Sequence, residues 1–328
     1  MKTMIKTIFL TLGLLLFVSC EKEIEFNGEI SEPMVVLNSY ISPDSIIYAH
    51  LTKSRFFLNN NRGFEFINNA DILVYVNHVF REKLNFTENG IYRGTFKPTA
   101  GDTVRLLVKV TGYDDVESTT TVLSPSNILS TEAKMVEKSR DEYTINGEVS
   151  AHYLSGNCEF NVKIRDNVSE QNYYRLVVKK RNLNIYSNDT IISEYFINFS
   201  LEGFDSQSGD LIGLFDDGEN RNDQHLITDE LFNGKEFVLK FTTDYAYLEV
   251  VPGYEEYYNY KNPGGSESVI INLQAITKDM YLYLKSKESA NGIFEGFFTE
   301  PVQIYNNISN GIGIFGAYTN NEFTYKLY

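Results

Sequence analysis

Short runs of β-branched and aromatic residues, separated by polar turns, dominate the chain from Met34 onward. Such residues fit the half-buried, pleated surface of a β-strand. The candidate strands of the first part are Met34–Tyr40, Ile46–Thr52, Asp71–Val76, Ile91–Phe96, Thr103–Val110 and Val116–Val122. Polar turns such as Asn89-Gly90 join them, and strands at this spacing are typical of two packed antiparallel sheets. The pattern predicts an immunoglobulin-like β-sandwich over residues 31–125.

The pattern is interrupted at Ser124-Pro125-Ser126-Asn127, which is the predicted domain boundary. Beyond it, further strands are predicted at Glu159–Ile164, Tyr173–Val178, Tyr195–Phe199, Phe237–Thr243, Val269–Ala275 and Val302–Tyr325. One segment differs, because Ile276, Met280 and Leu284 recur at helical spacing around Thr277, the predicted N-cap. Residues 126–328 are therefore predicted to form a larger β-rich domain with one short helix near 277–290.

The first twenty residues have the order of a secretory signal. Lys2 and Lys6 precede an uncharged apolar run from Thr7 to Val18, which ends in Ser19-Cys20. Twelve helical residues would span about 18 Å, whereas the hydrocarbon core of a bilayer is about 30 Å thick. The segment is thus too short for a permanent membrane span. Its end resembles a bacterial lipobox, which predicts a signal peptide over residues 1–19 and acylation of Cys20.

Charged residues follow the predicted acylation site. The stretch Glu21-Lys22-Glu23-Ile24-Glu25 resembles the export signal of Bacteroidetes-type lipoproteins that face the cell exterior, and Ile24 interrupts its acidic run. The alternative interpretation is a merely solvated tether. Residues 20–30 are therefore predicted to be an acidic tether on an outer-membrane protein that faces outward.

Charge and composition exclude several classes of function. The formal net charge is −15, from 44 acidic and 29 basic residues. Nucleic-acid binders need a basic surface, so we expect no nucleic-acid partner. Only 2 Cys and 4 His are present, which argues against a disulfide scaffold and a Cys-rich zinc site. No HExxH or GxSxG motif occurs, and we expect no cofactor and no catalytic residue.

Three further motifs have a structural and a functional interpretation. The segment Gly311–Gly316 matches the letters of a dinucleotide fingerprint but lacks a following helix, so we expect a strand whose glycines allow close packing. A candidate calcium site is formed by Asp216, Asp217 and Asp223. The alternative interpretation is a solvated acidic loop. Cys158 lies in a predicted strand and is expected to be a buried thiol rather than a nucleophile.

Tyrosines are concentrated in one stretch of the second domain. They are Tyr245, Tyr247, Tyr254, Tyr257, Tyr258 and Tyr260, followed by the Gly-rich loop Asn262–Gly265. Exposed tyrosines suit recognition of peptides, glycans or proteins, because each ring offers a large apolar area and a hydroxyl group. Tyrosines also occur on buried strand faces. The stretch is the predicted site for a ligand or partner, with the core as the alternative.

Several segments together resemble one family. They are the lipobox and tether Cys20–Glu25, the start Val35–Pro43, the segment Thr228–Lys235 and the ending Asn307–Ala317. They are similar to Bacteroidetes-type outer-membrane lipoproteins labelled as domain of unknown function 4249. The resemblance implies a lipid-anchored surface protein with a β-sandwich N-terminal part, often encoded near TonB-dependent outer-membrane transporters. It implies no catalytic residue.

Together with these features, the resemblance implies a non-enzymatic binding or accessory module for nutrient capture beside a TonB-dependent transporter. Its expected partners are the outer membrane, through acyl chains on Cys20, and an unidentified small-molecule, glycan or peptide ligand. A structural or adhesive lipoprotein that contacts other proteins is the alternative. A hydrolase with an unrecognised site is a third hypothesis.

Overall fold

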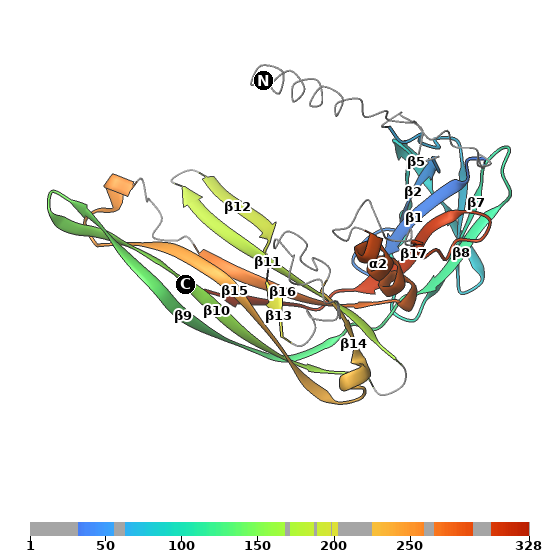
Figure 1. Ribbon diagram of the computed structural model, residues 1–328. Helices are drawn as coiled ribbons and strands as arrows, with labels where there is room; N and C mark the ends of the chain where they lie inside the picture. Colours follow the sequence, from blue (N-terminus) through green and yellow to red (C-terminus); the bar gives the residue numbers. More distant parts are fainter. Residues whose placement is uncertain are drawn as a thin grey trace, which may run out of the picture.

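The computed structural model describes residues 32–55, 63–167, 171–186, 189–197, 199–202, 225–258, 266–290 and 303–327. Within these ranges the chain forms two β-rich bodies, an N-terminal sandwich and a longer C-terminal body (Figure 1). The helical segments of the same ranges are α2 (Lys278–Ala290) and two short 3-10 turns, η1 (Asp229–Leu231) and η2 (Glu255–Tyr258). The predicted mainly β fold with a single short helix near 277–290 is confirmed.

The N-terminal sandwich consists of two packed sheets. One contains, in spatial order, β17 (Ile312–Thr319), β1 (Val35–Ile41), β2 (Tyr48–Lys53), β6 (Ile91–Arg93) and β5 (Asn85–Glu88). The other contains β4 (Val79–Lys83), β3 (Asp71–Val76), β7 (Thr103–Lys109) and β8 (Val116–Thr121). Every second residue of β1 and β7 is buried, so the inner faces of both sheets share one apolar core.

The C-terminal body has longer strands. Its first sheet contains β13 (Ser200–Leu201), β15 (Glu236–Val250), β10 (Glu148–Arg165) and β9 (Asn127–Ile145). The facing strands are β12 (Asp189–Phe196), β11 (Tyr173–Tyr186), β16 (Ser266–Ile276), β14 (Leu226–Thr228) and β18 (Glu322–Lys326). Their second core includes the stacked rings of Phe160 and Phe241, whose centroids lie 5.0 Å apart.

The turn predicted at Asn89-Gly90 is present, and a second Asn-Gly pair forms a turn of the same kind. Asn89 and Gly90 have φ angles of 46° and 72°, and Asn146 and Gly147 have 54° and 85°. Positive φ at both central residues is what an Asn-Gly hairpin turn requires. The second of these turns joins β9 to β10, which run side by side over their whole length.

The two bodies are joined through a shared sheet. Strand β17 runs parallel to β1 in the sandwich, and at its end Thr319 pairs with Ala275 of β16 in the C-terminal body. The chain passes from β8 to β9 near Ser124, returns for β17, and enters the C-terminal body again for β18. Helix α2 packs on β17 and β11 beside this junction (Figure 1).

The Gly311–Gly316 segment explains how β17 fits between β1 and α2. Gly313 has a φ of 123°, and a Cβ at this residue would lie 2.1 Å from the Leu37 carbonyl oxygen. A Cβ on Gly316 would lie 3.0 Å from Cβ of Met280 in α2. The predicted structural role of these glycines is confirmed, since one admits a neighbouring backbone and the other admits the helix.

Candidate functional site

The structure separates the six predicted site tyrosines. Tyr245 is only 6% exposed and belongs to the core of the C-terminal body. Tyr254 donates a hydrogen bond of 2.6 Å to the Glu148 carboxylate, and Tyr257 is 67% exposed. The side chains of Tyr247 and Tyr258, and all of Tyr260, lie outside the described residues. The stretch therefore divides between core and surface.

Gly156 explains why the Tyr245 side chain is buried. The two residues are directly opposite each other on β10 and β15. A Cβ on Gly156 would lie 2.9 Å from the Tyr245 hydroxyl oxygen and 2.0 Å from the Val136 carbonyl oxygen. Only a residue without a side chain leaves room there for both neighbours. The burial of Tyr245 is thus a consequence of a strand glycine that sequence analysis did not single out.

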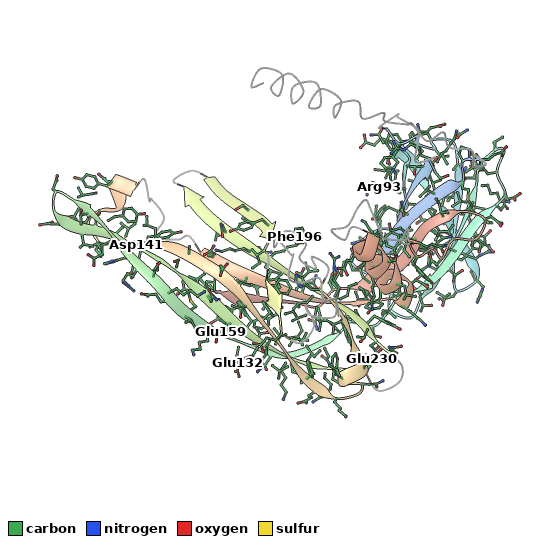
Figure 2. The ribbon with its side chains drawn as sticks, in the orientation of Figure 1. Arg93, Glu132, Asp141, Glu159, Phe196 and Glu230 are labelled. Atoms are coloured by element: carbon green, nitrogen blue, oxygen red, sulfur yellow. The ribbon has the colours of Figure 1, made fainter. Side chains whose placement is uncertain are left out.

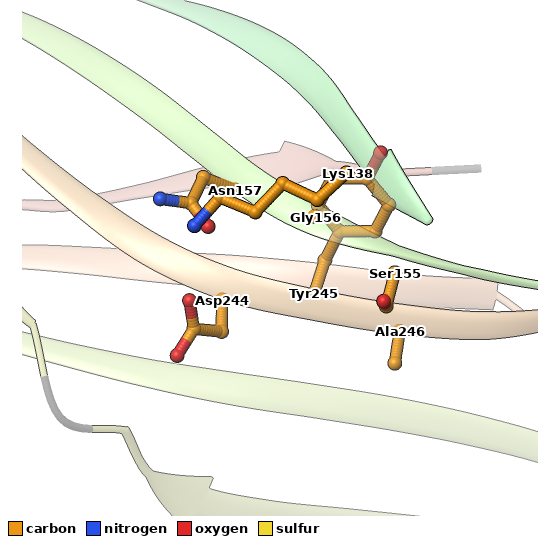
Figure 3. Close-up of a pocket in the computed structure, with 7 residues that line it drawn as sticks. All are labelled: Lys138, Ser155, Gly156, Asn157, Asp244, Tyr245 and Ala246. Carbon is orange, nitrogen blue, oxygen red and sulfur yellow. The ribbon is translucent and has the colours of Figure 1, made fainter. Parts of the chain in front are cut away.

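A concavity of about 390 Å³ lies at the same place on the sheet of β9, β10 and β15 (Figure 3). Its lining residues are Lys138, Ser155, Gly156, Asn157, Asp244, Tyr245 and Ala246. The pairing of β9 with β10 shifts here, because Ser139 pairs with Ser155 while Glu137 pairs with Gly156, which leaves Lys138 as the extra residue of a β-bulge. Bulges bend a strand and redirect side chains, and this one brings Lys138 to the rim of the concavity.

The concavity offers several polar groups. Among the described residues, Lys138 and Asp244 form no ion pair, and the buried Oδ1 of Asn157 accepts no hydrogen bond. A buried acceptor without a partner costs free energy, which a ligand with a donor group would recover. The arrangement therefore suits a small polar ligand that carries both donors and acceptors. It contains no nucleophile paired with a base.

A second polar cluster lies at the junction of the two bodies, where sequence analysis predicted no site. Tyr40 of β1, Tyr318 of β17 and Arg175 of β11 meet the helix residues Tyr283 and Glu288. Burial raises the pKa of Tyr40 above its usual range, and the neighbouring Tyr283 adds to this rise. Burial also lowers the pKa of Arg175, while the Glu288 carboxylate opposes that change.

The junction cluster brings side chains of both bodies into contact with α2. The Arg175 Nε is buried without a hydrogen-bond acceptor, and the rings of Tyr173 and Tyr281 lie 4.8 Å apart beside it. A signal was present in the sequence, because Arg175 interrupts an otherwise aromatic and apolar strand, Tyr173–Val178. An arginine in such a strand needs partners from another element, and the topology supplies them from α2.

Exposed apolar side chains gather on the C-terminal hairpins. The residues from Ile192 to Phe196 of β12 are all exposed, so both faces of this strand are accessible to solvent. Phe196, labelled in Figure 2, is 71% exposed. The Lys179 ammonium nitrogen lies 5.2 Å from the centre of its ring. Single exposed apolar side chains are normal on a protein surface, and here Ile192, Tyr195 and Phe196 share one strand.

Other predicted positions have separate outcomes. Cys158 is fully buried, which confirms the predicted buried thiol, and this burial raises the pKa of the thiol to about 11. Cys20, with the signal peptide and tether, lies outside the described residues, and so do Asp216, Asp217 and Asp223. In the part of the chain that is described, no three His, Cys, Asp or Glu side chains gather as metal ligands. No helix of that part is both long and apolar enough to cross a bilayer.

Comparisons with known proteins place this two-body β protein in a family. The family model for the domain of unknown function DUF4249 matches residues 21–324. The chain belongs to this family, which confirms the resemblance given by its motifs. No curated protein matches the chain significantly.

A solved structure of a protein described as membrane-anchored, from Corynebacterium diphtheriae, is similar over 75% of this chain at 9% identity with a TM-score of 0.20. This chain spans 55% of that protein's length.

Proposed function

We propose that this protein is a lipid-anchored protein of the outer-membrane surface, and that it works there as a non-enzymatic binding or accessory module for nutrient capture beside a TonB-dependent transporter. The anchor is supported by the apolar run that ends in Ser19-Cys20 and by the charged tether after it. Two or three acyl chains hold a protein on a membrane far better than the marginal binding of a single chain.

The observation that carries the binding role is the placement of accessible side chains. The N-terminal segment joins the sandwich at β1, whereas the strand β12 belongs to the C-terminal body (Figure 1). Tyr257 of η2 and the polar concavity belong to that body as well. In a protein anchored at its N-terminus, the sandwich is then the part nearest the attachment point. The C-terminal body remains available for solutes and partner proteins.

The concavity favours a small polar ligand. Its volume of about 390 Å³ lies within the usual range of ligand sites, roughly 300–1,000 Å³. Its lining combines the Lys138 ammonium, the Asp244 carboxylate and the Asn157 amide. These groups pair with the hydroxyls of a glycan or the backbone and termini of a peptide.

An adhesive role is the second candidate function. It is favoured by β12, whose two exposed faces suit a protein partner better than a small molecule. The two functions differ in which surface they need, because ligand capture depends on the concavity and adhesion depends on β12.

Pull-down from outer membranes through a C-terminal tag, combined with binding assays on a glycan and peptide library, tests both. Capture should weaken in Lys138→Ala and Asp244→Ala if the concavity binds the ligand. Phe196→Ala should weaken it instead if the protein is an adhesin. Phe80→Ala, which removes an exposed ring from the sandwich, is the matched control. Equal capture by all four variants would contradict the proposal.

A further inference from the structure

The end of the sandwich where β1 begins carries a group of exposed apolar side chains. Met34, Phe64 and Phe66 are all exposed, and Phe64 is 65% exposed. Backbone pairing brings them together, because the Ser54 amide donates to the Met34 carbonyl at 2.8 Å and Phe66 bridges to Thr52 of β2. We call Met34, Phe64 and Phe66, with Arg55, the anchor-side patch.

Arg55 gives the anchor-side patch an amphipathic character. Its guanidinium lies 5.6 Å from the centre of the Phe64 ring and donates to the Gly63 carbonyl at 3.5 Å. Next to it, Lys53 forms an ion pair with Glu65. Phenylalanine rings enter the boundary between lipid headgroups and acyl chains when they form the apolar side of an amphipathic surface, and an arginine beside them reaches the headgroups.

The length of the preceding chain limits what can cover this patch. Eleven residues lie between Cys20 and Glu32, where the described chain begins, and Met34 is 14 positions after Cys20. A fully extended chain spans at most about 3.6 Å per residue, so the tether holds Met34 within roughly 50 Å of the acylated residue. Because the tether confines the patch near the membrane, the effective concentration of lipid at the patch is high. Even a weak contact between patch and lipid is then populated.

We infer that the anchor-side patch rests on the lipid bilayer and orients the sandwich on the membrane. This inference depends on the proposed acylation of Cys20. The rings of Phe64 and Phe66 enter the headgroup region, while Arg55 meets lipid phosphates. The C-terminal body is consequently held away from the bilayer in a fixed direction, rather than swinging freely on its tether.

The experiment uses the full acylated chain in vesicles of phosphatidylethanolamine and phosphatidylglycerol. Phe64→Cys carries an environment-sensitive fluorophore, and Tyr257→Cys, at a site of nearly equal exposure in the C-terminal body, is the control. The fully buried Cys158 and the acylated Cys20 do not take up the label. The label at residue 64 should shift to the blue in vesicles and be quenched by brominated lipids, whereas the label at residue 257 should remain unquenched.

Other occupants of the patch give different results. A blue-shifted label at residue 64 without vesicles would show that the tether itself or a second copy covers the patch, and would overturn the inference. Membrane-bound protein with an unquenched label at residue 64 would also overturn it while leaving the anchor intact. Failure of the acylated chain to associate with vesicles would overturn both proposals.

A second measurement uses Cys20→Ala from which residues 1–19 have been removed, at vesicle concentrations high enough to populate binding through the patch alone. Burying one phenylalanine side chain contributes about 1.5–3 kcal/mol, so Phe64→Ser together with Phe66→Ser should weaken this binding at least about tenfold. Phe80→Ser is the matched control and should leave it unchanged. Equal vesicle binding by the double variant and the control would contradict a lipid contact at this end.

Discussion

The strands of the two bodies differ in length and in how many of their side chains are buried. In the sandwich, strands of three to eight residues match the width of the core, and β1 and β7 bury every second side chain. In the C-terminal body, β9 has 19 residues and is buried at none of them, while β12 is exposed on both faces from Ile192 to Phe196. Where a strand extends beyond the core, its side chains are accessible to solvent and to binding partners.

The two bodies also differ in how their edge strands are protected from pairing with other chains. Strand β9 is a long edge strand, and such edges invite pairing with other chains unless charged residues discourage it. Its sequence carries Lys134, Glu137, Lys138 and Arg140, and the Arg140 guanidinium contacts Glu137 at 3.2 Å. The short edge strand β8 needs less of this protection, because Ser309, in the segment that leads into β17, forms a bridge to its residue Glu117.

The largest effect is expected where the sandwich is most tightly packed. Gly313→Val places a Cβ against the Leu37 carbonyl at a φ of 123°, which only glycine adopts readily. Backbone strain and overpacking together should cost about 3 kcal/mol or more. The melting temperature should fall sharply in thermal unfolding, whereas Gly63→Ala, with no atom within 4 Å of the new Cβ, should be nearly neutral.

The same measurement tests the fingerprint-like sequence. If β17 is purely structural, NAD or ATP should not change the melting temperature of the wild-type protein. Stabilisation by either nucleotide, together with a mild effect of Gly313→Val, would contradict the structural interpretation.

A smaller effect is expected within the C-terminal body, and it differs between core and surface. Tyr245→Ala removes a buried ring that contacts the second core, and large-to-small changes of this kind cost about 3 kcal/mol. Tyr257→Ala removes a ring that is largely exposed, and such changes usually stay within about 0.5 kcal/mol. Denaturant unfolding of the two variants measures this difference. Equal destabilisation would show that the projecting region is packed as tightly as the core.

The local pattern of the sandwich was predictable because each strand alternates and each turn has its own chemistry. The predicted segments Asp71–Val76 and Thr103–Val110 correspond to β3 and β7, and the helix predicted behind Thr277 begins at Lys278. The strands β4 and β5 were not predicted, because Val79–Lys83 and Asn85–Glu88 are almost entirely exposed and carry no alternation.

Long-range pairing was beyond the reach of the pattern. Nothing local in Ile312–Thr319 indicates a parallel partner at Val36–Ile41, almost three hundred residues earlier, and that pairing sets the junction of the two bodies. For the candidate site, the tyrosine composition was visible but its division was not, since Gly156 and the bulge at Lys138 decide which ring is buried. Local sequence reports which residues favour a strand, whereas register decides which neighbours they meet.

The smallest expected effect on stability concerns exposed ion pairs between β15 and β10 in the C-terminal body. Glu236 of β15 lies 2.6 Å from the Lys163 ammonium and also contacts the Arg165 guanidinium, both on β10. Hydrogen bonds from these two groups lower the pKa of Glu236 from 4.5 to about 2. The charged carboxylate is therefore favoured in the folded state, and its contribution to stability is present above pH 4.5 and is lost as the pH falls towards 2.

Glu236→Gln should lower the melting temperature slightly at neutral pH, and the difference from wild type should shrink as the pH is reduced from 4.5 to about 2. Added salt should also reduce it, because exposed pairs are screened. Glu132→Gln, which removes an exposed carboxylate from the neighbouring β9, is the control for net charge (Figure 2). If the difference in melting temperature between wild type and Glu236→Gln grew as the pH fell, the charged Glu236 carboxylate would not stabilise the folded state, and the assigned direction of its pKa shift would be wrong.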